Sequence, residues 1–180
     1  MEKNKIVVCI AIAVLGRLIV HVPDVTPLSA LALLSPVIFS KRLSFFITFF
    51  SLLLSDFALH ILLHEPWFGN WSWFTYSGWL GVTALGCIFI QTSFQARFSR
   101  ASALAVISSF LFWVWTNFGT WLTAHLYPLT SQGLLDCYIA ALPFLRNALI
   151  GSVIWILFFL CGYRILMRKL TPDQKICAII

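Results

Sequence analysis

Long apolar runs, separated by short polar or proline-rich segments, divide the chain into six candidate membrane-spanning helices. We expect these spans at about residues 6–20, 28–39, 43–63, 73–90, 101–126 and 147–167. A helix that crosses a bilayer needs about 20 mainly apolar residues. The pattern predicts a polytopic all-α membrane protein, with residues 1–180 forming a single integral membrane domain.

The second span is unusually short. Its 12 or so residues reach only about 18 Å, against a hydrocarbon core of about 30 Å. Pro23 and Pro27 prevent a regular helix just before it, and Pro36 lies near its end. We expect either that the connector dips into the membrane or that the helix is buried among others. Irregular backbone at that depth must be buried in protein or line a cavity, and transporters often place binding sites at such breaks.

The last apolar stretch, residues 133–167, is too long for one crossing. We predict that residues 134–144 form an extra helix, either at the outer surface or partly inserted, that stops near Pro143. Arg146 and Asn147 would then open the sixth span.

Composition supports a membrane environment. Hydrophobic residues make up 61% of the chain and charged residues only 10%. A soluble domain of 180 residues cannot bury that much apolar surface. The net charge of +6 does not indicate nucleic-acid binding, because the basic residues form short clusters at span ends.

The basic clusters predict the orientation. Ten of the twelve Lys and Arg residues fall at alternate span ends, so we place these ends and both termini in the cytoplasm. The segment at residues 6–16 resembles the apolar part of a signal peptide, but no convincing cleavage site follows it, and we expect a retained first span. The cytoplasmic basic residues are Lys3, Lys5, Lys41, Arg42, Arg97, Arg100, Arg164, Arg168, Lys169 and Lys175.

Uncommon polar residues concentrate towards the opposite, outer half of the predicted spans. Charges at membrane depth cost at least about 2.5 kcal/mol, so each needs a partner or a use. One interpretation is structural, with Asp56 paired to Arg17 or Arg146. A second is an outward-facing substrate cavity, and a third is a metal site that includes Asp56 and His60, although two ligands are a weak signal. The candidate polar contacts are Arg17, Asp56, His60, Asn117, Arg146 and Asn147.

Aromatic residues also gather at the outer end. They are typical of an interfacial belt, and alternatively line a pocket for a flat apolar ligand. We select Trp71 and Trp121 as candidate stacking surfaces for a substrate. The chain has no nucleotide-binding loop and no hydrolase or zinc-protease motif, so we expect no catalytic residues, no metal and no cofactor.

Several segments resemble a group of small bacterial integral membrane proteins of uncharacterised function. They are residues 25–33 (VTPLSALAL), 54–56 (LSD), 116–121 (TNFGTW), 127–128, 133–134, 137–138 and 141–144, with Asn147. The group is similar, more distantly, to the S-components of energy-coupling-factor (ECF) vitamin transporters. That resemblance implies six helices in the bacterial inner membrane and a small-molecule site near the outer loops.

The resemblance also bears on partners. S-components work with a separate coupling protein and separate ATPases, and many dock through an Ala-x-x-x-Ala pattern in the first helix. Here Cys9 replaces the first alanine and Ala13 keeps the second, so the chain either uses an ECF-type coupling protein or acts alone.

We therefore expect uptake of a vitamin or cofactor precursor, with membrane lipid as solvent and no nucleic acid. The alternative is a non-transporting scaffold similar to six-helix cell-shape proteins, in which the cytoplasmic loops matter most. A membrane-embedded enzyme has the least support, because it would need a titrating Asp56 or His60 beside a bound lipid.

Overall fold

The computed structural model describes residues 2–19, 24–64, 66–89 and 94–169. Within these ranges the chain forms seven helices and no strand. They are α1 (Glu2–Ile19), α2 (Pro27–Ile38), α3 (Lys41–Leu63), α4 (Ser72–Phe89), α5 (Phe94–Thr123), α6 (Ser131–Ala140) and α7 (Leu142–Lys169). The prediction of an all-α fold with a short second helix and an extra helix before the last one is confirmed.

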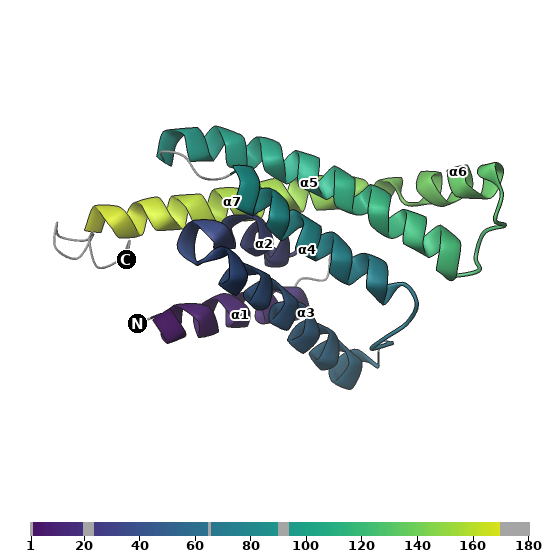
Figure 1. Ribbon diagram of the computed structural model, residues 1–180, viewed down its shortest axis with the longest axis horizontal. Helices are drawn as coiled ribbons and strands as arrows, with labels where there is room; N and C mark the ends of the chain where they lie inside the picture. Colours follow the sequence, from purple (N-terminus) through teal and green to yellow (C-terminus); the bar gives the residue numbers. More distant parts are fainter. Residues whose placement is uncertain (1, 20–23, 65, 90–93, 170–180) are drawn as a thin grey trace.

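The helices form an elongated bundle around α2. In Figure 1 the long helices α5 and α7 run side by side, and α1, α3 and α4 lie along the other flank. The short helix α2 contacts α1, α3, α4, α5 and α7. The start of α1, the junction of α2 with α3 and the end of α7 lie at the same end of the bundle, while α6 lies at the other (Figure 1). The basic residues of these three segments therefore share one end.

Local signals set both ends of α2. The Thr26 hydroxyl accepts a hydrogen bond from the Leu28 amide at 3.1 Å, and Pro27 occupies the first turn, where its missing N–H costs nothing. The helix ends at Ile38, two residues after Pro36, and Ser40 caps the start of α3. Most residues of α2 are buried. The expectation that this short helix lies among the others is confirmed.

Close backbone contacts hold α2 in place. Gly86 of α4 lies against the backbone carbonyl of Leu33, where a Cβ atom would collide with the carbonyl oxygen. Val25, just before α2, packs in the same way on Gly151 of α7. The chain just before α2 therefore meets α7 at Val25. Val25 and Thr26 are half-buried, whereas Asp24 is exposed.

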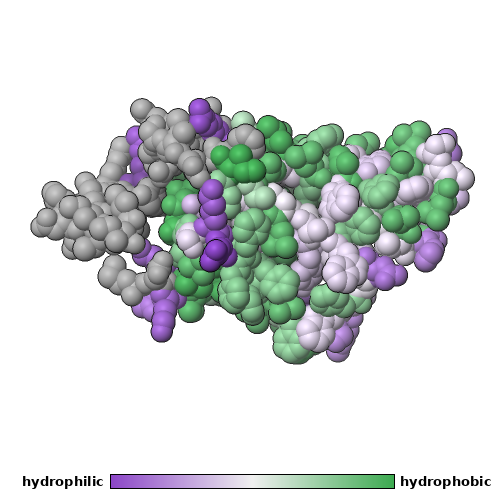
Figure 2. All heavy atoms as spheres, in the orientation of Figure 1, coloured by the Kyte–Doolittle hydropathy of each residue, from purple (hydrophilic) through white to green (hydrophobic). Residues whose placement is uncertain are grey.

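Among the described residues, three helical segments are long and apolar enough to cross a membrane: Lys41–Leu63, Arg100–Thr123 and Leu142–Gly162. Large apolar side chains are exposed along all three, including Phe46, Phe110 and Ile154. Figure 2 shows an apolar band across the middle of the visible face, with hydrophilic residues towards the two ends. This arrangement indicates a membrane-embedded protein.

The helices differ from the predicted segments at three points. Arg100 lies within α5, which begins at Phe94, because no proline or glycine separates these two residues. The membrane-length segment Arg100–Thr123 still begins close to the predicted start of the fifth span. The extra helix ends at Ala140 rather than near Pro143, and Pro143 lies in the first turn of α7, where proline favours helix initiation. Arg146 and Asn147 therefore lie one turn inside α7 instead of opening it. His21, Pro23 and Lys175 lie outside the described residues.

Candidate functional site

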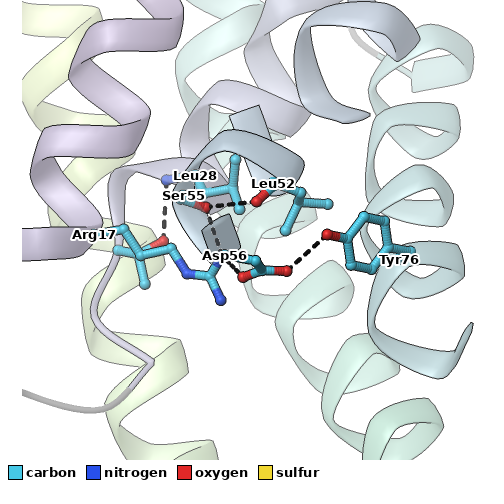
Figure 3. A network of polar contacts seen from close by, with 7 residues as sticks. Arg17, Leu28, Leu52, Ser55, Asp56 and Tyr76 are labelled. Atoms are coloured by element: carbon cyan, nitrogen blue, oxygen red, sulfur yellow. Dashed lines mark hydrogen bonds and ion pairs between the residues drawn. The ribbon is translucent and has the colours of Figure 1, made fainter. Parts of the chain in front are cut away.

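A buried polar network joins three helices at the carboxyl group of Asp56. Arg17 Nη1 of α1 donates to Asp56 Oδ1 at 2.5 Å and to the Ser55 hydroxyl at 2.6 Å. The Tyr76 hydroxyl of α4 donates to Asp56 Oδ2 at 2.8 Å. Figure 3 shows Arg17 and Tyr76 reaching this carboxyl group from opposite sides. One carboxylate therefore ties α1 and α4 to α3.

Burial explains why the network forms. The side chain of Asp56 is 6% exposed and that of Arg17 is 21% exposed. A charge in these surroundings is stable only when an opposite charge or hydrogen bonds replace its lost water. The contact agrees with the structural interpretation of Asp56, and it selects Arg17 rather than Arg146 as the partner. Nη2 and Nε of Arg17 have no hydrogen-bond partner within the part of the chain that the structure describes, so they keep free donors.

A small polar cavity of about 40 Å³ lies where the connector before α2 meets α2, α4, α5 and α7. One carboxyl group and four hydroxyl groups line it: Asp24, Thr26, Ser29, Ser108 and Ser109. The apolar part of its wall consists of Trp79, Val82, Phe112 and Ala148. A space of this size holds a few water molecules or a small head group, not a whole vitamin.

The hydroxyl groups are oriented by the nearby backbone. Ser29 donates to the Thr26 carbonyl at 3.0 Å, and Ser108 donates to the Ala105 carbonyl at 3.2 Å. Since each has used its proton, each offers only acceptor lone pairs to the cavity. The Asp24 carboxyl has no hydrogen-bond or ion-pair partner among the described residues, although Arg17 is near enough to act on it electrostatically. Partial loss of water raises the pKa of Asp24, and the charge of Arg17 lowers it.

An apolar groove of about 410 Å³ adjoins this cavity on the side of α4 and α5. The two spaces share Val82, Ser108 and Phe112 as lining residues. Gly78 and Gly81 form part of the groove, and Gly81 has open space where a side chain would begin. The indole N–H of Trp115 donates to Ser77 at 2.8 Å and fixes one wall. The groove falls within the range of about 300–1,000 Å³ that is usual for small-molecule sites.

The structure brings Arg17 and Asp56 into contact but does not gather the other predicted site residues around them. The His60 ring lies one turn further along α3 than Asp56. Its centroid is 6.0 Å from the centroid of the Trp67 ring. Asn117 donates to the Trp113 carbonyl of its own helix at 2.8 Å. Arg146 is exposed and Asn147 is half-buried on α7.

The two candidate stacking residues, Trp71 and Trp121, make hydrogen bonds that stabilise local turns. The Trp121 indole N–H donates to the Pro128 carbonyl at 3.0 Å, and the Trp71 carbonyl accepts from the amides of Phe74 and Thr75. Neither residue lines the cavity or the groove.

Sequence reasoning missed Tyr76 and the residues that line the cavity. Single serines and aromatic residues inside apolar helices are common and carry no distinctive signal. Asp24 was not among the candidate residues selected from the sequence. The only sequence signal for the cavity was the pair of prolines, Pro23 and Pro27, that flank Asp24. Among the described residues, no group of three or more His, Cys, Asp or Glu side chains could hold a metal ion.

Comparison with protein families gives one match, over residues 2–174, to a family described as Family of unknown function (DUF6580). The chain belongs to this family. The match covers almost all of the chain, so all seven helices lie within the family's domain. Comparison with curated proteins and with solved structures gives no match.

Proposed function

We propose that this DUF6580 protein is a six-span protein of the bacterial inner membrane that captures a small nutrient and passes it inward. The nutrient is a vitamin or a cofactor precursor, as for an ECF S-component. The observation that carries the proposal is a cavity lined by Asp24, a carboxyl group without a partner among the described residues. This cavity adjoins an apolar groove on the exposed face of α4 and α5 in a bundle that includes membrane-length helices.

The lengths and ends of the helices support the proposal of six crossings. The helices α1 and α4 have 18 residues each, or about 27 Å, which is close to the thickness of the hydrocarbon core. With the three longer segments and the short α2 they make six passes, and the start of α1 and the end of α7 lie at one end (Figure 1). The basic residues at that end favour a cytoplasmic location for it. The cavity then faces the outer half, beside the break before α2.

The packing of α1 is relevant to how transport would be energised. Ala13 is 2% exposed and packs on Leu28 and Leu31 of α2, with Cys9 packed against the same cluster. The small-residue face that S-components use for docking is therefore occupied within this chain. This favours a protein that acts alone, or one that meets a coupling protein and its ATPases through another surface.

Gentle purification followed by native mass spectrometry tests the capture proposal. Gly81→Leu fills the groove, while Gly162→Leu adds the same side chain on α7, also in open space but outside the groove. We expect a small molecule to co-purify with the wild type and with Gly162→Leu, and to be lost from Gly81→Leu. Cells that express the wild type should accumulate that molecule faster than cells that express Gly81→Leu.

The scaffold alternative predicts a different result. No molecule would co-purify with any variant, and Gly81→Leu would be silent in cells. Removal of the cytoplasmic charges would cause the defect: Lys41, Arg42, Arg97 and Arg100. That set of results would refute the capture proposal.

A further inference from the structure

The polar cavity carries an uncompensated negative charge. The charges of Arg17 and Asp56 neutralise each other across their 2.5 Å ion pair. Asp24 has no such partner among the described residues, yet it lies near enough to Arg17 for the two charges to interact. This group of three therefore sums to one negative charge. Asp24 is exposed, yet it also lines the cavity. A carboxylate attracts positive charge, so this wall of the cavity favours a cation.

The hydrogen-bonding pattern adds that the cation should carry N–H groups. The Ser29 and Ser108 hydroxyls donate to backbone carbonyls, and the Thr26 hydroxyl accepts a hydrogen bond from a backbone amide. The cavity thus presents carboxylate and hydroxyl oxygens with lone pairs and few protons. Ser109 lines the same space and makes no hydrogen bond to a described residue, so its hydroxyl can turn to suit a ligand. A head group with several donors satisfies this lining better than an alcohol or an anion.

The aromatic part of the wall favours an organic cation over a metal ion. Trp79 and Phe112 both line the cavity, with their ring centroids 4.6 Å apart. Aromatic faces attract organic ammonium groups through the charge distribution of the ring. A small metal ion gains little from such rings and prefers several fixed oxygen ligands.

The adjoining groove indicates what the cation is attached to. Phe112 and Val82 line both spaces, and the glycines of α4 leave the far wall open. A molecule whose head group occupies the cavity can place an apolar or aromatic portion in the groove. The groove's volume of about 410 Å³ suits a portion the size of one or two rings.

We propose that the substrate is a small organic cation, with a protonated amine or a similar N–H-bearing head held by Asp24, Ser29, Ser108 and Ser109, and an apolar portion in the α4–α5 groove. This assignment rests on the proposed function, because it names the chemical class that the protein captures.

The test compares two probes of the same shape on the purified full chain in lipid nanodiscs. 2-Phenylethylammonium carries the charged head, and 2-phenylethanol is its neutral counterpart. Tryptophan fluorescence and thermal stability report binding. We expect the ammonium probe to bind about tenfold or more tightly than the alcohol, since a hydrogen bond to a charged group contributes more than a neutral one. Sodium chloride at equal ionic strength should not substitute for the ammonium probe.

Two variants assign the head group to the cavity. Asp24→Asn should lower affinity for the ammonium probe to within about threefold of the alcohol, and leave alcohol binding unchanged. Ser109→Ala should weaken binding of the ammonium probe by about threefold. If Asp24→Asn does not fold, this second variant still tests the assignment. Asp136→Asn is the matched control, since this acid lies on α6 with Gln132 as its partner, and it should bind both probes as the wild type does.

The outcomes separate the two proposals. Equal binding of the two probes by the wild type, or full ammonium binding by Asp24→Asn and Ser109→Ala, would overturn the cation assignment. If Gly81→Leu still abolishes binding of both probes in that case, the capture site stands and only its head-group chemistry is wrong. Protection by sodium ions alone, with no dependence on the apolar portion, would also overturn the assignment in favour of an inorganic cation site.

Discussion

The Tyr76 hydroxyl donates to one oxygen of the Asp56 carboxylate, while Arg17 occupies the other. Because these contacts differ in charge, their removal should differ in cost. Tyr76→Phe deletes one hydrogen bond and should lower the free energy of unfolding by about 1 kcal/mol. Asp56→Asn leaves Arg17 without its counter-charge and should cost about 3 kcal/mol. Unfolding in mixed detergent micelles measures both changes, and Asp136→Asn serves as the surface control.

A double-mutant cycle isolates the ion pair. Arg17→Gln and Asp56→Asn should each destabilise the protein, and the double variant should lose clearly less than the two together, with a coupling of about 1–3 kcal/mol. If the single effects simply add, the contact between these two side chains does not stabilise the bundle.

The contact between Gly86 and the Leu33 carbonyl predicts a stability difference between glycines of similar sequence context. Gly86→Ala should force α2 and α4 apart and cost about 1–3 kcal/mol. Gly81→Ala meets nothing within 4 Å, and it should be neutral or stabilising by up to about 1 kcal/mol, since alanine favours a helix. Thermal unfolding in detergent measures both. Equal effects of the two substitutions would contradict the packing of α2 on α4.

Trp121 should contribute more to the stability of the protein than to ligand binding. Trp121→Phe removes the indole N–H that bonds to the Pro128 carbonyl, and should lower the free energy of unfolding by about 1 kcal/mol. Trp73→Phe, at a side chain that is 78% exposed, is the matched control and should have little effect. A loss of ligand affinity in Trp121→Phe without a loss of stability would restore the substrate-stacking role predicted for this residue.

The orientation can be tested from both ends of the bundle. A reporter active only in the cytoplasm should be active when fused after α7 and inactive when inserted between α5 and α6. We expect this because basic residues gather at the former end and the turn-rich α5–α6 connection lies at the other (Figure 1). A tail that is accessible from the periplasm would reverse the orientation and place the cavity on the wrong side for capture.

Helix boundaries show where local sequence signals are sufficient and where they fail. The ends of α2 follow from Thr26, Pro27 and Pro36, which act on the backbone within one turn. The helices α5 and α7 begin before Arg100 and Arg146, the charged residues that were interpreted as span ends. A helix continues through a charged residue wherever that side chain can reach solvent or the membrane interface.

The sequence by itself determined the helical class, the short second helix and the gathering of basic residues at one end. These follow from hydrophobic runs, prolines and charges, whose effects on the backbone are local or depend only on membrane depth. Only the tertiary structure decided which polar groups meet. Asp56 pairs with Arg17 and Tyr76, while Asp24 faces serines of α5 across the cavity. That choice depends on how each helix is rotated and how deeply it is set against α2, and no spacing along the chain encodes a relation between separate helices.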